Sequence, residues 1–283
     1  MKKRILLPTD FSQDSLNALR YGLDVYRNEA CEFHILHIYY LGGYAAENLM
    51  IPKPEDKEYE KHRLIAESNM EKLKEVVGSL ESTSNHDIRF STHFGPFLDI
   101  IRDTVKQDNT DLILMGTRSQ NEHHNPNFGS VTVSVMETIR SCPVLAIPVD
   151  VKFKSINEIV FPTGFRTRYK EEDLRYLADF SKLINAPIRI LYISKGEPLT
   201  AKQQKKKEQL ESSFSNVSYS HHSLYHVPVV TGVRCFVQSR ESEMITFVNK
   251  KHFFFSSVFS DPMVKQLGRF TDVPLLAMHD NKE

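Results

Sequence analysis

The segment MGTRSQNEHHNPNFGSV, which begins at residue 115, combines glycines, hydroxyls and an arginine in a pattern suited to an anion. Gly116 allows the backbone to approach a ligand closely or to adopt a positive φ. Gly129 and Ser130 open a predicted helix, whose unpaired N–H groups and dipole favour negative charge. Thr132 adds a hydroxyl donor, and Arg118 adds a guanidinium suited to phosphate. This pattern predicts a phosphate-binding loop. The simpler alternative is a surface loop that ends at a serine N-cap.

Asp10 follows the first predicted strand, and Gly116 ends the fourth. Open parallel sheets bind ligands beyond the carboxyl ends of strands, at the point where the strand order reverses. If these two strands are neighbours, Asp10 and the glycine loop share one crevice. Asp10 can then accept hydrogen bonds from ribose hydroxyls or hold a metal ion such as Mg²⁺. The alternative is that Asp10 only helps to start the following helix.

The histidines give no metal site. His123 and His124 lie in the loop without a carboxylate partner, so we interpret them as exposed loop residues rather than ligands of a metal or a phosphate. His34 and His37 differ by three along a predicted strand, so their side chains point to opposite faces and are not expected to share a site.

Short apolar runs alternate with amphipathic helical patterns, which is typical of a parallel sheet covered on both faces. Strands are predicted at 4–8, 33–40, 87–93, 111–116 and 143–148, and helices at 13–28, 55–80, 97–108 and 130–141. The strand at 87–93 alternates apolar and polar residues, which places it near an edge of the sheet.

The second half of the sequence repeats the first. EIVFPT at 158–163 matches RILLPT at 4–9, and VPLLAM at 273–278 matches CPVLAI at 142–147. The offset falls from about 155 to 131, so the second copy is shorter in its middle. The prediction is an α/β protein of two tandem, doubly wound, open parallel-sheet domains, 1–149 and 156–283. Both are expected to be Rossmann-like.

The charges balance, with 36 Lys+Arg and 36 Asp+Glu. This balance argues against nucleic acid and anionic membranes as partners. The apolar run at the N-terminus stops at Pro8, too early for a signal peptide, and no run is long enough to span a bilayer. The three cysteines form no CxxC pair, which fits a reducing setting. We expect a soluble cytoplasmic protein.

Several short stretches resemble the universal stress protein family. They are PTDF at 8–11, LHI at 36–38, MGTRS at 115–119, FGSVT at 128–132 and CPVLAIP at 142–148. The family pattern is G-x-x-G, nine residues, then G-[ST]. This chain keeps the spacing, with Ser119 where the family has its second glycine. The resemblance is strong in the first half and weak in the second, and it implies a fold like that of the adenine nucleotide alpha hydrolases for both domains.

In family members that bind nucleotide, these residues form an ATP site, so the resemblance implies ATP, with or without Mg²⁺, and leaves ADP or AMP as alternatives. Thr9 and Asp10 would contact the ribose and adenine side, and Ile38 would line the adenine pocket. The residues implied around the phosphates are Gly116, Arg118, Ser119, Gly129, Ser130, Val131 and Thr132.

The second half lacks these features. Gly164 stands in place of Asp10, VNKKH at 248–252 in place of MGTRS, and Ser260-Asp261-Pro262 near the Gly-Ser position. We expect this domain to fold without binding ATP and to act mainly as a pseudo-dimer partner. The resemblance implies antiparallel pairing of 143–148 with 273–278. The phenylalanines at 253–255 would then lie in the core or the interface, and the alternative is that they line a different ligand pocket. It leaves open a homodimer of whole chains.

Three functions remain open. The first is an ATP-binding stress-response or regulatory protein, read by an unidentified protein partner. The second is a slow ATP hydrolase or phosphotransferase, although no general base is evident and neither GxxxxGK[ST] nor GxGxxG occurs. The third is a nucleotide-free protein-interaction scaffold. The Gly/Ser spacing favours the first over the third, and the missing base favours it over the second. At most a weak ATPase is expected, and no catalytic residue is predicted.

Overall fold

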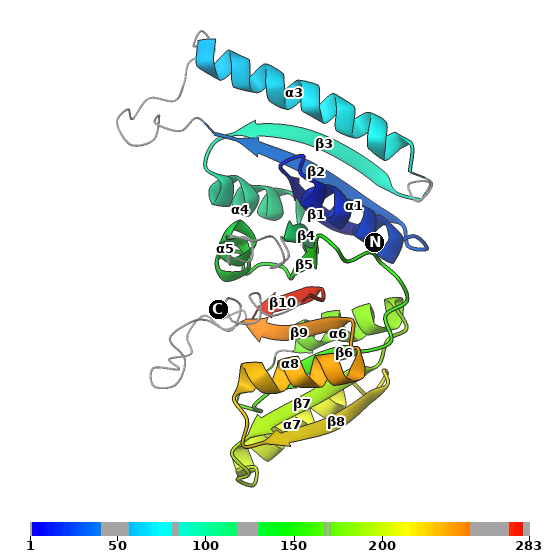
Figure 1. Ribbon diagram of the computed structural model, residues 1–283, viewed down its shortest axis with the longest axis vertical. Coiled ribbons are helices and arrows are strands. Elements are labelled where there is room, and N and C mark those ends of the chain that lie inside the picture. Colours follow the sequence, from blue (N-terminus) through cyan, green and yellow to red (C-terminus); the bar gives the residue numbers. More distant parts are fainter. Residues whose placement is uncertain are drawn as a thin grey trace, which may run out of the picture.

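A computed structural model describes residues 2–40, 57–80, 85–117, 130–166, 169, 171–249 and 272–279. In these residues, ten strands form one sheet in the order β3-β2-β1-β4-β5-β10-β9-β6-β7-β8 (Figure 1). We call β1 to β5 with their helices the first half and β6 to β10 with theirs the second half. The first half contains β1 (Lys3–Thr9), α1 (Gln13–Val25), β2 (Cys31–Tyr39), α3 (Lys57–Gly78), β3 (Asp87–Phe94), α4 (Phe97–Asp108), β4 (Leu112–Thr117), α5 (Ser130–Thr138) and β5 (Val144–Pro148). The second contains β6 (Ile159–Thr163), α6 (Glu171–Leu183), β7 (Ile188–Ser194), α7 (Ala201–Ser213), β8 (Tyr219–Tyr225), α8 (Val229–Arg240), β9 (Met244–Asn249) and β10 (Leu275–His279).

The predicted α/β fold is confirmed, with strands and helices close to their expected bounds. Ser12 is the N-cap of α1, and its side chain accepts a hydrogen bond from the Ser15 N–H. Two helices end three residues before the prediction. α1 ends at Val25, and α5 ends at Thr138 because the chain must leave the helical region before Pro143.

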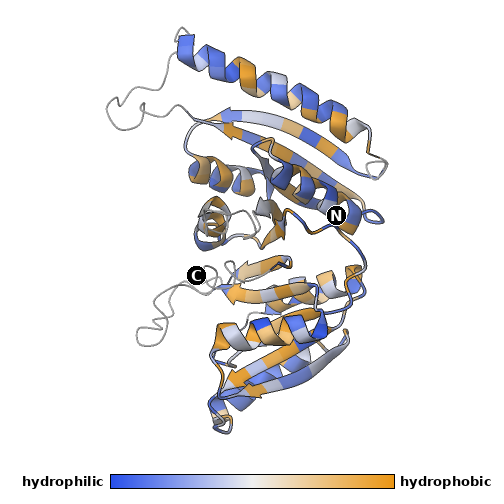
Figure 2. Cartoon of the chain, in the orientation of Figure 1, coloured by the Kyte–Doolittle hydropathy of each residue, from blue (hydrophilic) through white to orange (hydrophobic). Residues whose placement is uncertain are grey.

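The inner strands of the sheet are buried on both faces because they are apolar on both sides. Alternate residues of β1 belong to different cores: Ile5 and Leu7 pack with α1 and α3, whereas Leu6 packs with α4 and α5. In the second half α6 and α7 cover the first of these faces and α8 covers the other. Figure 2 shows much orange on inner strands such as β7 and β9, whereas the edge strand β8 and much of α3 are blue or pale. Short apolar runs in sequence therefore correspond to strands with two covered faces.

The two halves meet at β5 and β10, which pair antiparallel, whereas the other strand pairs among the described residues are parallel. Leu276 lies opposite Leu145, and Ala277 lies opposite Val144. The antiparallel pairing expected for these strands is therefore present. Read outward from this seam, each half has the same strand order, 5-4-1-2-3. β3, predicted near an edge, is an edge strand.

The shortening of the second half lies between its second and third strands. In the first half 47 residues separate Tyr39 from Asp87, and in the second 24 residues separate Ser194 from Tyr219. The first-half connection contains the 22-residue helix α3, and the second-half connection contains the 13-residue helix α7. The core strands are kept while one peripheral helix is reduced. In the described part of the chain, every helix is too short or too polar to cross a membrane.

Candidate functional site

The strand order reverses beside β1. β1 pairs with β2 on one side and with β4 on the other, and both pairs are parallel. Ile5 lies opposite Leu112, and this register brings the end of β1 beside Gly116 near the end of β4. The two strands from which we predicted a shared crevice are therefore neighbours at the switch point.

The turn that carries Asp10 is held by its own side chains. The Phe11 N–H donates to Thr9 Oγ1 at 3.1 Å, and Thr9 Oγ1 is 3.0 Å from Ser15 Oγ in α1. Phe11 has φ of 63°, in the left-handed region. Thr9 is buried, whereas Asp10 next to it is exposed. The turn thus presents one carboxylate at the edge of the sheet.

Asp10 remains ionised and also stabilises the start of α1. Its Oδ1 accepts hydrogen bonds from the N–H and the hydroxyl of Ser12. Partial desolvation alone would raise the pKa of Asp10, but these hydrogen bonds outweigh it, so the pKa lies below its usual value. The helix-starting role that we considered as an alternative is therefore present, and both hydrogen bonds from Ser12 go to the same carboxylate oxygen, Oδ1.

Gly116 is required for packing against α1. A Cβ at this position would lie 2.2 Å from the carbonyl oxygen of Asp14 and 2.8 Å from the backbone nitrogen of Ser15. Gly116 does not have a positive φ; among the described glycines, Gly95 and Gly196 do. Of the two properties for which a glycine was considered at this position, the structure uses close approach and not a positive φ. The close approach that needs a glycine is made by the first turn of α1.

The start of α5 is attached to the end of β4. The Thr132 hydroxyl donates to the Gly116 carbonyl oxygen at 3.1 Å, and the Thr132 side chain is buried. Ser130 is the first residue of α5, and Val131 beside it is 50% exposed. Arg118, Ser119 and Gly129 lie outside the described residues, as do His123 and His124.

β2 contributes Ile38 and a residue that the sequence analysis did not assign to the site. Ile38 is half-buried against the α4–α5 face of the sheet. His37, on the opposite face, has its Nδ1 2.8 Å from the Thr9 carbonyl oxygen and its ring centroid 4.3 Å from that of Phe11. The sequence did contain one signal for His37: it is a histidine near the end of a strand that neighbours β1.

The corresponding turn of the second half is filled. The Phe165 N–H donates to Thr163 Oγ1 at 3.0 Å and Phe165 has φ of 49°, as at Phe11 in the first half. However, Phe165 is buried, and the buried Tyr169 hydroxyl is hydrogen-bonded to Thr163 Oγ1. Gly164 replaces the carboxylate. Two aromatic rings therefore occupy this end of β6.

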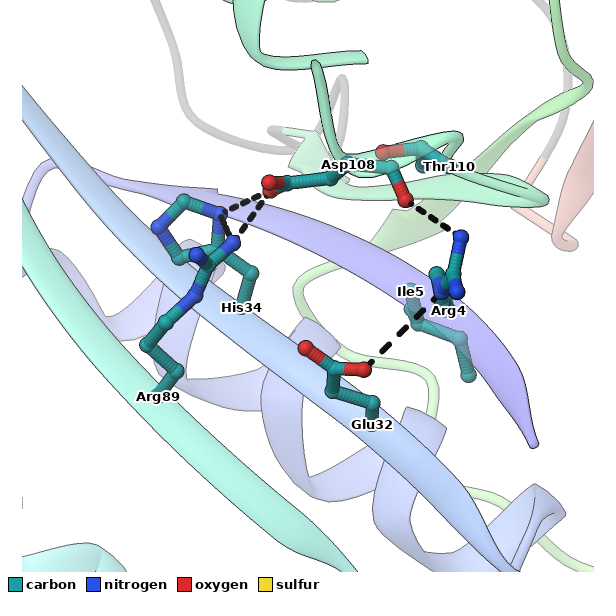
Figure 3. Close-up of a pocket in the computed structure, with 7 residues that line it drawn as sticks. All are labelled: Arg4, Ile5, Glu32, His34, Arg89, Asp108 and Thr110. Atoms are coloured by element: carbon teal, nitrogen blue, oxygen red, sulfur yellow. Dashed lines mark hydrogen bonds and ion pairs between the residues drawn. The ribbon is translucent and has the colours of Figure 1, made fainter. Parts of the chain in front are cut away.

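A polar cluster lies at the opposite edge of the first half, where the strands begin (Figure 3). His34 Nδ1 is 2.7 Å from Asp108 Oδ2, and His34 Nε2 is 2.7 Å from Ser91 Oγ. Arg89 donates to the same Asp108 carboxylate, and Arg4 donates to the Asp108 carbonyl oxygen at 3.0 Å. The cavity beside them is about 10 Å³, room for a single water. His34 and His37 do point to different faces, as predicted.

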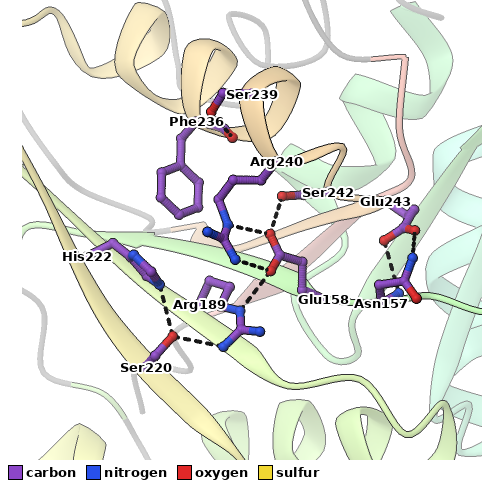
Figure 4. Close-up of polar contacts among 10 residues, drawn as sticks. All are labelled: Asn157, Glu158, Arg189, Ser220, His222, Phe236, Ser239, Arg240, Ser242 and Glu243. Atoms are coloured by element: carbon purple, nitrogen blue, oxygen red, sulfur yellow. Dashed lines mark hydrogen bonds and ion pairs between the residues drawn. The ribbon is translucent and has the colours of Figure 1, made fainter.

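The second half has a cluster at the same place with its charges reversed (Figure 4). Glu158, which aligns with Arg4, accepts hydrogen bonds from Arg189 at 2.7 Å and from Arg240, the last residue of α8, at 2.7 and 2.8 Å. Desolvation alone would raise the pKa of Glu158, but these partners and Ser242 lower it to about 2. Asp108 is likewise the last residue of α4. Both clusters tie a helix end to the strands, so we interpret them as structural.

The remaining candidates are not brought together as a metal site. Within the described ranges there is no group of three or more His, Cys, Asp or Glu residues able to hold a metal ion. The phenylalanines at 253–255 and the segment at 260–262 lie outside those ranges, as does most of 248–252. The described part of the site therefore consists of the Asp10 turn, the ends of β2 and β4, and the start of α5.

Comparisons with known proteins agree with this architecture. A universal stress protein from Archaeoglobus fulgidus DSM 4304 has a similar structure, with a TM-score of 0.74, 18% identity and 98% of each chain covered. A functionally unknown protein from Pseudomonas aeruginosa PAO1 aligns with a TM-score of 0.58 and 10% identity, over 98% of this chain and 92% of the other. No curated protein was found to match the sequence. The sequence model of the universal stress protein family matches residues 1–148. The chain therefore belongs to the universal stress protein family.

Proposed function

We propose that the first half binds an adenine nucleotide, ATP with ADP or AMP as alternatives, beyond the ends of β1 and β4, and that a protein partner responds to the bound state. The observation that carries this proposal is the hydrogen bond between Thr132 Oγ1 and the Gly116 carbonyl oxygen. It fixes the beginning of α5 against the end of β4, next to the Asp10 turn. A helix N-terminus and a carboxylate at one switch point suit a molecule with phosphates and a ribose.

The Asp10 carboxylate suits the sugar. It is exposed and ionised, and it needs only one oxygen for its contacts with Ser12. The other oxygen can accept hydrogen bonds from ribose hydroxyls. A Mg²⁺ bound with the phosphates would prefer such an oxygen ligand, and it would neutralise phosphate charge. Thr9 supports the turn, and Ile38 offers an apolar contact for the base.

The start of α5 suits the phosphates. The N–H groups of Ser130, Val131 and Thr132 lie in its first turn, where they have no carbonyl partner within the helix. The exposure of Val131 leaves this turn accessible. Family membership and the pattern Gly116…Gly129-Ser130 add to the argument, with Arg118 and Ser119 as further candidate phosphate contacts in the loop.

The second half is proposed as a partner domain without nucleotide. Tyr169 and Phe165 fill the end of β6, and Gly164 supplies no carboxylate. Its role is to complete the ten-stranded sheet through β10. We treat the boundaries 1–149 and 156–283 as a proposal, together with a cytoplasmic location, where ATP is abundant and cysteines such as the buried Cys31 and Cys142 stay reduced.

Isothermal titration calorimetry with ATP, ADP and AMP, with and without Mg²⁺, tests the proposal on the full chain. We expect one nucleotide per chain, and strongly weakened binding in Asp10→Ala. Asp87→Asn, at the opposite edge of the sheet, should bind normally. Val131→Glu should weaken binding because its carboxylate repels the phosphates. Val131→Gln introduces a side chain of the same size as glutamate but without the charge, so it should not weaken binding.

Each contrary result has a definite meaning. No heat with any nucleotide at millimolar concentration would overturn nucleotide binding and favour the scaffold alternative. Phosphate release from the same samples, lost in Asp10→Ala, would instead favour the slow hydrolase. Equal affinity in Val131→Glu and Val131→Gln would show that the phosphates do not lie at α5.

A further inference from the structure

Asp108, His34 and Ser91 form a continuous hydrogen-bonded series in the first-half cluster. His34 Nδ1 lies 2.7 Å from Asp108 Oδ2, and His34 Nε2 lies 2.7 Å from Ser91 Oγ. The three residues come from three elements, the end of α4, β2 and β3. Figure 3 shows the His34 ring directed at the Asp108 carboxylate. A hydroxyl, an imidazole and a carboxylate joined in this order are the parts of an activated serine nucleophile.

The carboxylate fixes which nitrogen of His34 carries the hydrogen. Desolvation alone would raise the pKa of Asp108, but hydrogen bonds from Arg89 and His34 outweigh it and hold the pKa below its usual value. The ionised carboxylate can only accept, so His34 Nδ1 donates to it. Arg89 Nη2 lies 2.8 Å from Nδ1 because it donates to the same oxygen.

The other nitrogen of His34 is therefore the basic one. Burial, with smaller contributions from Arg89 and His93, keeps the pKa of His34 below its usual value, although Asp108 raises it. The ring is then neutral near pH 7, and Nε2 accepts the hydrogen of the Ser91 hydroxyl. A neutral imidazole that accepts from a serine is poised to remove its proton.

Ser91 lies where a substrate can reach it. It belongs to the edge strand β3 and is half-buried, whereas Arg89 and His93, two residues before and after it, are exposed. Because side chains alternate along a strand, these three point to the same face. Arg89 uses one of its several N–H groups for Asp108, and its guanidinium can also stabilise negative charge on an oxygen beside Ser91. The adjoining cavity of about 10 Å³ is too small for a long acyl chain.

The structural tie between α4 and the strands does not require this series. Asp108 is held by Arg89 without the help of Ser91. In the second half Arg189 stands at the place of His34, and α8 is tied to the strands without an imidazole. An imidazole between a carboxylate and a hydroxyl therefore adds to the first half a feature that the tie itself does not explain.

We propose that Ser91 is a nucleophile activated by His34, and that the first-half cluster transfers short acyl groups from esters to water. Asp108 is a positioning residue that holds the imidazole in the required tautomer. The inference does not rest on the proposed nucleotide site, which lies beyond the opposite ends of the strands.

The reaction has two steps. Ser91 Oγ bonds to the carbonyl carbon of the ester while its proton moves to His34 Nε2. The bond from that carbon to the alcohol oxygen then breaks, and Nε2 gives the proton to the leaving alcohol. In the second step Nε2 takes a proton from a water molecule, whose oxygen attacks the acylated serine. The carboxylic acid leaves, and the proton returns to Ser91 Oγ.

Labelling of the full chain with a fluorophosphonate tests the nucleophile, because this reagent bonds covalently to activated serines. Mass spectrometry of the resulting peptides identifies the labelled residue directly. Ser91→Ala removes the nucleophile, and His34→Gln removes the base. Ser220→Ala is the matched control: Ser220 Oγ also lies 2.9 Å from a histidine Nε2, that of His222, but in the described part of the chain no carboxylate is hydrogen-bonded to that ring.

The pH dependence of labelling separates positioning by Asp108 from a purely structural role. Labelling needs the neutral imidazole, so its rate should fall as the pH drops through the pKa of His34. Asp108 raises that pKa, whereas Arg89 and His93 lower it. Asp108→Asn should therefore slow labelling and move the acidic fall to lower pH, in a chain that circular dichroism shows to be folded. A slower rate with an unmoved profile would overturn the positioning role.

Wild type and Ser220→Ala should carry the label on Ser91, and Ser91→Ala should carry none. Release of p-nitrophenol from p-nitrophenyl acetate should fall at least roughly hundredfold in Ser91→Ala and in His34→Gln. Absence of label from Ser91 at millimolar reagent, release no faster than in buffer, or equal release by wild type and Ser91→Ala would overturn the inference. None of these results would affect the proposed nucleotide site.

Discussion

The ammonium nitrogen of Lys3 lies 5.2 Å from the ring centroid of Tyr176, although one residue belongs to β1 and the other to α6 of the second half. The same nitrogen is 5.4 Å from the ring centroid of Tyr26, the residue that follows α1. One cation therefore interacts with aromatic rings from both halves. Burial in this contact raises the pKa of the Tyr176 phenol well above its usual value, so the ring stays neutral.

Replacing the Lys3 cation should lower the stability of the folded chain. We expect Lys3→Met, which keeps the length of the side chain, to lower the free energy of unfolding by about 1 kcal/mol because the cation–π contacts are lost. Lys2→Met is the control, since Lys2 forms an exposed pair with Asp87 and such pairs contribute little. Urea unfolding of both variants measures the difference. Equal losses would show that the aromatic contacts of Lys3 add nothing.

Two glycines should respond in opposite ways to the same substitution. Gly116→Ala places a Cβ 2.2 Å from a backbone oxygen of α1, so α1 or β4 must move, and we expect a loss of roughly 2 kcal/mol or more. Gly78→Ala, at the end of α3, meets nothing within 4 Å and should raise stability by up to about 1 kcal/mol. Thermal unfolding of the two variants measures both changes in stability. A neutral Gly116→Ala would contradict the close packing described here.

His279 should make the fold sensitive to mild acid. Desolvation, with a smaller contribution from Arg140, lowers the pKa of this buried histidine to about 3. Because that value is below the unfolded pKa, stability is complete above about pH 6.5 and falls as the pH drops towards 3. Between pH 7.5 and 5 the loss from His279 alone should be about 2 kcal/mol.

The measurement is urea unfolding at these two pH values. His279→Leu should lose less stability than wild type on acidification, and the exposed His93→Gln should behave as wild type. An unchanged pH dependence in His279→Leu would show that His279 is already charged, or solvated, in the folded chain.

Much of the fold could be predicted because its signals are local. RILLP and DLILMG are apolar runs bounded by polar residues, and Ser12 followed by helical spacing marks the start of α1. The same signals led to the neighbouring positions of Asp10 and Gly116, since both end strands of one parallel sheet. The antiparallel seam between β5 and β10 followed from the family resemblance rather than from the strands themselves.

What the sequence could not provide depends on contacts between distant residues. The need for Gly116 arises from Asp14, a hundred residues away, and not from its own backbone angle. His37 was recognised only as pointing away from His34, because its contacts with Thr9 and Phe11 exist only after β1 and β2 pair. The filling of the second-half turn by Tyr169 has the same origin. Loop residues such as Arg118, Ser119 and Gly129 remain predictions.

The seam between β5 and β10 also affects how the two halves can evolve. Each strand satisfies the exposed edge of the other within one chain, so a first half always meets a second half and never a copy of itself at this edge. A carboxylate at Asp10 and a glycine at Gly164 therefore occur together in every molecule, in a fixed ratio. Mutations that remove a ligand contact from one half leave the other unaffected. A covalent pair of this kind can specialise one member for a ligand and release the other for different surface contacts, without mixed assemblies in the cell.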